Sequence, residues 1–185
     1  MIKRYDGNLL LTPCPTVLVT AKHNGVENVF TVSWAGIASS HPEHVCIAIN
    51  KTRLSYSIIK ESKKFCISIP SEDLLQAVDY CGSHSGKDVD KFAKCNLNKE
   101  YIDDYILIKE CSMHILCDVV QIVDLGSHHL FIAKVTEKYI DDTIEKEIHN
   151  KLHPIAYYRP FYYKLEKLNA YYGYTVNKQY PKEEN

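Results

Sequence analysis

The chain has 185 residues, of which 45% are hydrophobic and 24% are charged, as in an ordinary globular protein. Its formal net charge of −1 argues against nucleic acid as the main partner, and no apolar run approaches the roughly 18 residues of a membrane span. The seven cysteines are irregularly spaced, which is typical of free thiols in a reducing cytoplasm. We therefore expect a cytoplasmic protein that contacts neither nucleic acid nor membrane. Its length predicts a single domain over residues 1–185, with a core over residues 13–165 and a tyrosine-rich tail over residues 166–185.

The first part of the chain has the composition of β-strands. β-branched and apolar residues predict strands over residues 16–21, 29–34 and 45–49. Asn24 and Gly25 lie between the first two strands and predict a hairpin turn, because both residues accept a positive φ. The second strand runs into a patch of small residues, 35–40.

The rest of the chain adds a few short helices and more strands. We predict helices over residues 55–62 and from Ser71 onward, with Ser71 as N-cap, and a helical turn over residues 88–94. Further strands are expected over residues 65–69, 113–123, 129–139 and 155–165, with a hairpin turn at 124–127 and a charged connector at 141–149. This order predicts a mainly β fold, an antiparallel barrel with a few short helices. A dinucleotide-binding domain is not expected, because the strands and helices do not alternate and no glycine-rich fingerprint follows a strand.

The stretch from Cys81 to Phe92 combines two glycines, two serines, a histidine and two lysines. Small residues allow close approach of a ligand, and hydroxyls and lysines suit an anion. The stretch is not the phosphate loop of nucleotide hydrolases, because only three residues separate Gly82 from Gly86 and Asp88 follows Lys87. A polar turn that ends a helix has the same composition, so that alternative stays open.

Three polar clusters could meet at one phosphate-bearing cofactor: residues 31–35, 50–56 and 83–91. Their cations are Lys51, Arg53, Lys87 and Lys91, and their hydroxyl donors include Ser33, Thr52 and Ser55. Trp34 is the one tryptophan, and it is either a core side chain or a wall against a flat ring.

Other chemistries find less support in the sequence. His128 and His129 are adjacent, so on a strand they point to opposite faces and cannot share a metal ion; we expect no metal site. Cys81 and His84 are the one local pair that suits a nucleophile and its base, although packing is the favoured role for every cysteine. Paired aspartates elsewhere have the pattern of solvated turn charges.

Three motifs in order resemble the flavin reductase–like proteins. The first is Pro13 and Pro15 followed by Asn28-x-x-Thr31-x-Ser33-Trp34-Ala35-Gly36. The second is Arg53-x-Ser55-Tyr56-x-x-Ile59. The third and most specific is Cys81-Gly82-x-x-Ser85-Gly86-x-Asp88-x-Asp90-Lys91-Phe92. The resemblance extends from about Pro13 to Leu165.

This resemblance implies an FMN-binding split barrel, an antiparallel Greek-key barrel that is usually a homodimer with FMN near the subunit interface. By position in the motifs, Ser33, Trp34 and Ala35 would meet the isoalloxazine ring, and Lys91 would be a charged partner. The implied cofactor-binding residues are Thr31, Val32, Ser33, Trp34, Ala35, Asn50, Lys51, Thr52, Arg53, Ser55, Tyr56, Ser83, His84, Ser85, Gly86 and Lys91.

The implied function is an FMN-dependent oxidoreductase that passes electrons from NADH or NADPH to flavin or to a downstream acceptor. No catalytic residue is expected, because the flavin carries the redox chemistry. One alternative is a flavoredoxin-type electron carrier reduced by a ferredoxin-like partner, which would dock on cations such as Lys87 and Lys94. A second alternative is a non-catalytic flavin-binding module.

Overall fold

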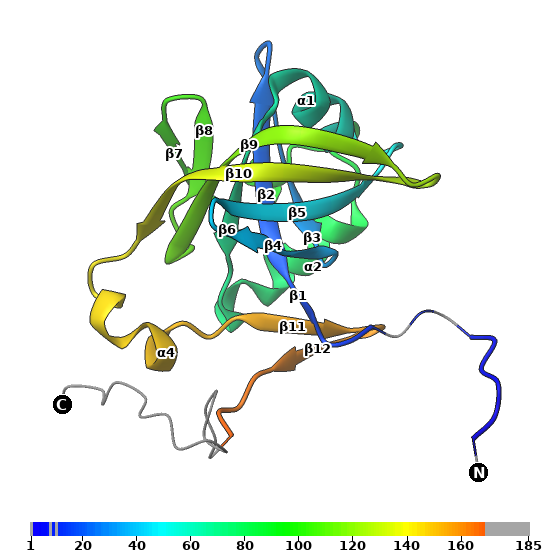
Figure 1. Cartoon of the computed structure of the whole chain (residues 1–185). Helices are drawn as coiled ribbons and strands as arrows, with labels where there is room; N and C mark the ends of the chain where they lie inside the picture. Colours follow the sequence, from blue (N-terminus) through cyan, green and yellow to red (C-terminus); the bar gives the residue numbers. More distant parts are fainter. Residues whose placement is uncertain (1, 8, 10, 169–185) are drawn as a thin grey trace.

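The structure of the chain is a computed structural model that describes residues 2–7, 9 and 11–168 (Figure 1). The strands are β1 (Cys14–Pro15), β2 (Val17–His23), β3 (Val26–Val32), β4 (Ala35–Ser40), β5 (Glu43–Asn50), β6 (Lys64–Ile69), β7 (Lys99–Ile102), β8 (Tyr105–Ile108), β9 (Met113–Asp124), β10 (His128–Ile140), β11 (Ile155–Tyr158) and β12 (Phe161–Lys164). The helices are α1 (Leu54–Ser62), α2 (Leu75–Ser83), α3 (Lys91–Lys94) and α4 (Ile148–Lys151), with short 3-10 turns η1 (Glu72–Leu74) and η2 (Glu145–Glu147). Within the described residues, no helix is both long and apolar enough to cross a membrane.

Seven of the strands form one antiparallel sheet, in the order β3-β2-β6-β9-β10-β5-β4. The predicted hairpin turn between β2 and β3 is confirmed, with Asn24 at φ 49° and Gly25 at φ 77°. The second predicted hairpin joins β9 to β10, and there Gly126 has a φ of 83°. Positive φ values match the twist that a tight hairpin requires, so the local sequence sets both turns.

The two edges of this sheet, β3 and β4, are separated in the chain by Ser33 and Trp34 alone. Because an extended residue spans at most about 3.6 Å, the three steps from Val32 to Ala35 keep the edges within about 11 Å of each other. The Trp34 carbonyl also accepts a hydrogen bond of 2.9 Å from the Ala48 amide on β5. The sheet must therefore curl into a barrel, and the mainly β prediction with a few short helices is confirmed (Figure 1).

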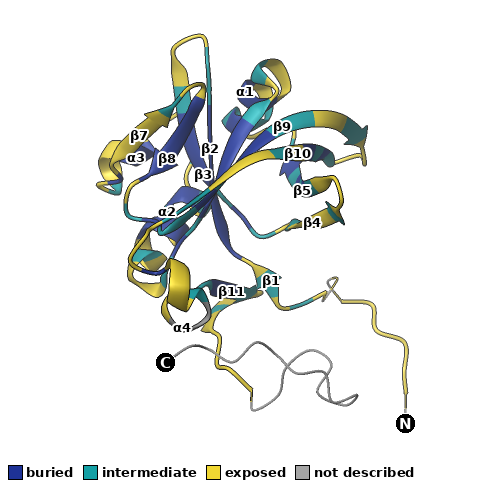
Figure 2. Cartoon of the chain, turned by 60° about the vertical axis from the view of Figure 1, so that its left-hand side comes forward, coloured by how far each residue is buried: buried dark blue, intermediate teal, exposed yellow. Residues whose placement is uncertain are grey.

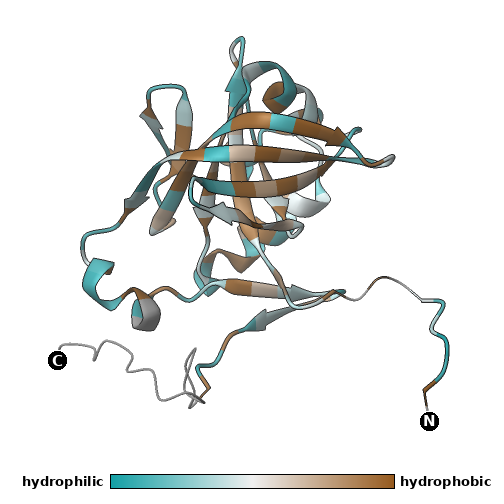
Figure 3. Cartoon of the chain, in the orientation of Figure 1, coloured by the Kyte–Doolittle hydropathy of each residue, from teal (hydrophilic) through white to brown (hydrophobic). Residues whose placement is uncertain are grey.

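The barrel encloses an apolar core to which strands from both ends of the sheet contribute. Val19 on β2, Phe30 on β3, Ile47 on β5, Phe65 on β6 and Phe131 on β10 all belong to one buried cluster. Hydrophobic residues accordingly concentrate along the barrel strands (Figure 3). A fully buried side chain of this size stabilises the fold by roughly 1.5–3 kcal/mol, so this shared core holds the sheet in its curled form.

A second apolar layer covers the outer face of β2 and β3. Leu18 and Val29 point away from the barrel interior and pack in one cluster with Val78 on α2 and Ile106 on β8. Residues 17–21 of β2 are thus buried on both faces (Figure 2), which is why this part of its sequence has no charged residue and does not alternate between apolar and charged side chains. This packing places the carboxyl end of α2 beside β3, close to the crossing between the sheet edges.

Two predicted strands have the wrong extent. The strand predicted over residues 29–34 ends at Val32, and the small residues 35–40 form the separate strand β4 at the opposite edge. The strand predicted over residues 155–165 is a hairpin, because Pro160 cannot donate to a ladder and the chain turns at Arg159 and Pro160. β11 and β12 pair with β1 in a three-stranded sheet, the small sheet, which lies beside one end of the barrel (Figure 1).

Some elements were not predicted. The β7–β8 hairpin was missed because its turn has no glycine; Asp103 adopts the positive φ of 47° instead. The charged connector at 141–149 contains η2 and the start of α4. Ser71 precedes η1, but its side chain makes no capping hydrogen bond. The predicted tail, residues 166–185, lies outside the described residues beyond residue 168.

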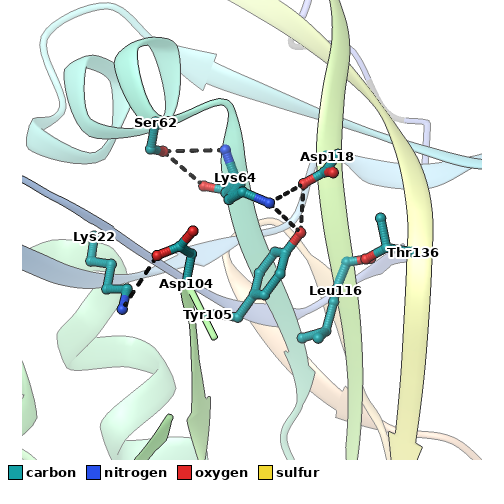
Figure 4. Close-up of polar contacts among 8 residues, drawn as sticks. All are labelled: Lys22, Ser62, Lys64, Asp104, Tyr105, Leu116, Asp118 and Thr136. Carbon is teal, nitrogen blue, oxygen red and sulfur yellow. Dashed lines mark hydrogen bonds and ion pairs between the residues drawn. The ribbon is translucent and has the colours of Figure 1, made fainter. Parts of the chain in front are cut away.

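A polar cluster of Lys64, Tyr105 and Asp118 joins β6, β8 and β9 (Figure 4). The Asp118 carboxylate accepts bonds from the Lys64 ammonium at 3.0 Å and from the Tyr105 hydroxyl at 2.5 Å. Burial alone would raise the pKa of Asp118, but these two donors outweigh it and lower that pKa. The cluster thereby fixes the unpredicted hairpin to the barrel.

Candidate functional site

A cleft of about 540 Å³ opens where the Ser33–Trp34 crossing, the end of β5 and the small sheet meet. On the barrel side it is lined by Phe30, Thr31, Val32, Ser33, Trp34, Ala48, Ile49, Asn50, Thr52, Arg53 and His128. On the other side it is lined by Leu9, Leu11, Thr12, Cys14, Tyr157, Tyr158 and Arg159. Two of the three predicted polar clusters, 31–35 and 50–56, thus contribute to one cavity.

Trp34 forms an aromatic wall of this cleft. Its side chain is 58% exposed, so the alternative of a core tryptophan is wrong. The indole lies against the His128 ring, with centroids 4.7 Å apart and an interplanar angle of 47°. Thr31 is fixed nearby, because its hydroxyl donates to the Val78 carbonyl of α2. The cleft therefore presents a flat, solvent-accessible ring at the point where the sheet edges meet.

The turn after β5 is held rigidly by its own polar groups. The Asn50 side-chain oxygen accepts bonds from the Thr52 amide at 3.0 Å and the Thr52 hydroxyl at 2.8 Å. Side-chain acceptance of this kind replaces a backbone turn bond and fixes the loop. The loop presents Arg53, whose guanidinium donates to the Gly82 carbonyl at 3.1 Å. Arg53 is thus a preorganised cation in the cleft.

Several predicted residues of these clusters do not line the cleft. Ala35 begins β4 and pairs with Ile47. Lys51 points to Asp124, with an ion-pair distance of 3.2 Å. Ser55 is fully buried, and its hydroxyl accepts a 2.7 Å bond from Asn28.

Tyr56 also points away from the cleft. Its ring packs edge-on against Phe131, and its hydroxyl lies 3.0 Å from Nδ1 of His129. His129 therefore faces the barrel and His128 the cleft, as expected for neighbours on a strand.

The third predicted cluster lies behind the cleft, at the carboxyl end of α2. Ser83 bonds back to the Asp79 carbonyl at 2.9 Å, and His84 stacks on Tyr80 with ring centroids 3.7 Å apart. The Ser85 hydroxyl accepts the Lys87 amide at 3.2 Å. None of residues 83–86 lines the cleft, although the preceding residue, Gly82, accepts the bond from Arg53.

Gly86 is required by packing in this loop. A β-carbon at this position would lie 2.3 Å from the Asn28 side-chain oxygen, and Asn28 is itself buried and bonded to Ser55. Close packing against Asn28 therefore explains why residue 86 is a glycine, without any ligand.

Lys91 is buried beneath the same loop. It is 3% exposed, and its ammonium donates to the Cys81 carbonyl at 3.0 Å and the His84 carbonyl at 3.5 Å. Burial lowers the pKa of Lys91 to about 8, with a smaller contribution in the same direction from Arg53. A helix carboxyl end carries a partial negative charge, which repels anions. Lys91 and Arg53 bind three carbonyls at this end and oppose that charge.

Cys81 packs in the outer apolar cluster and is 1% exposed. Burial raises the pKa of this thiol to about 12, so it is protonated at neutral pH and is a poor nucleophile. All seven cysteines are free. In the part of the chain that the structure describes, no group of three or more His, Cys, Asp or Glu side chains is placed to hold a metal ion.

The sequence did not identify the opposite wall of the cleft. That wall consists of residues before β1 and of the β11–β12 hairpin, including Tyr157, Tyr158 and Arg159. His128 joins the barrel side because it pairs with Asn50 across β10 and β5. Four tyrosines lie close together in the sequence around residue 160, but their composition alone does not say which cavity they face.

The ionisable side chains with a permanent charge in this cleft are all cationic. Arg53 and Arg159 line it, together with His128, and among the residues that the structure describes no Asp or Glu lines it. In a chain with a formal net charge of −1, this is a local positive site. The cleft thus combines an aromatic wall, hydroxyl and amide groups, and guanidinium groups.

Comparison with known proteins gives a consistent result. The family model described as "Flavin reductase like domain" matches residues 9–166. An uncharacterised protein of Pyrococcus abyssi is 33% identical over 130 residues, which cover 70% of this chain and 76% of that protein. The flavoredoxin of Desulfovibrio vulgaris (Miyazaki F) superposes with a TM-score of 0.84 at 26% identity, covering 93% of this chain and 97% of that one. Flavoredoxin from Methanosarcina acetivorans has the same TM-score at 22% identity, with 95% and 98% covered. The predicted split-barrel fold is thereby confirmed.

We predict that Lys91→Met removes one component of the pH dependence of stability. Because the pKa of Lys91 is about 8 in the folded chain and near 10.5 when unfolded, the unfolded chain binds more protons between these values. This group alone should therefore make the protein about 2 kcal/mol more stable at pH 9.5 than at pH 7. Urea denaturation at both pH values measures the change, and it should disappear in the variant.

Lys94→Met is the matched control, since Lys94 lies on the same helix but is exposed. It should retain the wild-type pH dependence. Equal pH dependence in wild type and Lys91→Met would contradict a buried ammonium at this position.

Proposed function

Because this chain belongs to the flavin reductase–like domain family, we propose that it binds FMN in the cleft and is an oxidoreductase that passes electrons from NADH or NADPH to flavin or to a downstream acceptor. The observation that supports this most strongly is the composition of the cleft. An exposed indole shares the cavity with two arginines, and no described residue lines the cavity with a carboxylate.

The described residues fit the parts of FMN. Trp34 offers a flat apolar surface to the isoalloxazine ring, and Thr31, Ser33, Asn50 and Thr52 offer hydroxyl and amide groups to a polyol. Arg53 offers a charge-assisted donor to a phosphate. It is already fixed by Gly82, so little side-chain entropy is lost on binding.

FMN supplies the redox chemistry, including acceptance of a hydride from a reduced pyridine nucleotide. The chain's residues bind, orient and partly shield the ring. Cys81 and His84 are not placed to act on the cleft, since neither lines it. The absence of a lining carboxylate is compatible with hydride transfer, which depends on close and stacked geometry more than on a general acid or base.

An electron carrier is the second candidate, and the likeness to the Desulfovibrio vulgaris flavoredoxin favours it. In that case a ferredoxin-like protein would reduce the flavin after docking on cations such as Lys87 and Lys94, both of which are exposed. A third reading is a non-catalytic flavin-binding module, which would bind FMN without accepting electrons from either kind of donor.

An anaerobic visible spectrum of desalted, FMN-loaded protein separates these roles. For the proposed oxidoreductase, the flavin band should bleach within seconds of adding NADH or NADPH. A band that persists with both nucleotides but bleaches with reduced ferredoxin supports the carrier, and the double variant Lys87→Glu with Lys94→Glu should slow that transfer several-fold. A colourless sample after FMN loading would contradict flavin binding altogether.

We also propose that the protein works as a homodimer in the cytoplasm. Large apolar side chains lie exposed in the cleft and on two strands that follow cleft residues in the chain: Leu11 lines the cleft and is 83% exposed, Ile37 on edge strand β4 is 85% exposed, and Phe161 on β12 is 63% exposed. Exposed apolar surface of this kind favours a subunit contact. The free cysteines support a reducing compartment.

Substitution of Ile37 by Asp should therefore shift the molecular mass in solution from dimer to monomer, because it places a charge on the edge strand beside the cleft. Light scattering coupled to size exclusion measures the mass. Val120→Asp is the control, as Val120 is an exposed residue of β9 that does not line the cleft, and it should leave the dimer intact. A wild-type monomer would contradict the proposal.

A further inference from the structure

The two arginines of the cleft come from different walls and have different environments. Arg53 extends from the barrel and is bonded to the Gly82 carbonyl. Arg159 extends from the turn between β11 and β12. Its side chain is exposed and has no hydrogen bond or ion pair with any other residue that the structure describes. At the rim opposite Arg53 the chain therefore places a cation that no described residue pairs with.

The turn that carries Arg159 is held by the fold on three sides. Tyr158 pairs with Phe161, which leaves Arg159 and Pro160 as a two-residue turn. β11 pairs with β1 through Cys14 and Tyr157.

The third contact fixes β12 to α2. Its Tyr162 hydroxyl donates to Asp79 at 3.0 Å, and burial together with this carboxylate raises the pKa of Tyr162 to about 12, so the donor proton is retained. Arg159 is consequently presented from a fixed position, as a preorganised binding group requires.

Two guanidinium groups in one cavity repel each other, and none of the described lining residues is a carboxylate that would compensate them. Neither group contributes to folding through an ion pair, so the arrangement suits a cavity that receives two anionic groups. The single phosphate of FMN, bound at Arg53, accounts for one of them. The exposed ring of Tyr158 adjoins Arg159 at the same rim and offers a stacking face for a base.

We propose that Arg159 binds a phosphate group of a pyridine dinucleotide that enters the cleft from the side of the small sheet. Arg159 is then a residue that selects the phosphate-bearing electron donor, and it does not hold FMN. This inference rests on the proposed function, because it requires flavin in the same cleft.

The test compares wild-type and Arg159→Gln protein loaded with FMN. Two readouts are used: the Kd of NAD+ and NADP+ by calorimetry, and the KM of NADH or NADPH against that of N-methyl-dihydronicotinamide, which donates a hydride but has no phosphate. A lost charge-assisted bond corresponds to about a tenfold or larger change in affinity. We expect such a loss for the dinucleotides, no more than twofold change with the phosphate-free donor, and an unchanged Kd for FMN.

Arg4→Gln is the matched control, because Arg4 is an exposed arginine that pairs with Asp6 and does not line the cleft. An equal loss with both donors, or a weaker FMN complex in Arg159→Gln, would overturn the inference by assigning Arg159 to the flavin or to the fold. Wild-type protein that binds FMN but neither dinucleotide would overturn it as well and would leave flavin binding intact. If the wild-type protein does not bind FMN, the proposed function itself is contradicted, and not only the role of Arg159.

Discussion

The structure depends on one covalent constraint, the two-residue crossing from β3 to β4 at Ser33 and Trp34. These strands are opposite edges of a seven-stranded sheet, so the crossing forces the sheet to close on itself. The shared apolar core of Phe30, Ile47 and Phe131 makes that closure favourable. At the crossing the chain cannot extend either strand, and the side chain of Trp34 is left outside the barrel, 58% exposed. The site is thus a direct consequence of how the barrel closes.

The electrostatics of the site follow from a second constraint, the position of the α2 carboxyl end beside β3. The carboxyl end of a helix carries a partial negative charge, which repels a phosphate. Buried Lys91 donates to the Cys81 and His84 carbonyls, and Arg53 donates to the Gly82 carbonyl from the cleft. These two cations offset the partial negative charge of the helix end. The loop that the sequence suggests as an anion site therefore lies behind the cleft, and its carbonyls accept bonds from these two cations. Its own serines are used within the loop.

Much of the fold could be predicted because local chemistry determines it. Asn24-Gly25 specifies its hairpin, and the β-branched and apolar residues 16–21 indicate the buried part of β2. The strand end at Val32 could not be predicted, since Ser33 and Trp34 are compatible with a strand and only tertiary closure breaks it there. The lining of the cleft could be predicted in part, as at Thr31 and Arg53, while their role toward a cofactor stays a prediction. Arg159 could not be placed, because its position depends on pairing between β11 and the distant β1.

The most direct test of this account is a titration of FMN into the protein, followed by the fluorescence of Trp34, the one tryptophan in the sequence. The account predicts strong quenching that saturates at one FMN per chain, and a Kd at least tenfold weaker in Arg53→Gln. Riboflavin, which lacks the phosphate, should bind wild type and Arg53→Gln alike. An indole signal that does not respond to FMN, or an FMN affinity that is indifferent to Arg53, would contradict the assignment of this cleft as the flavin site.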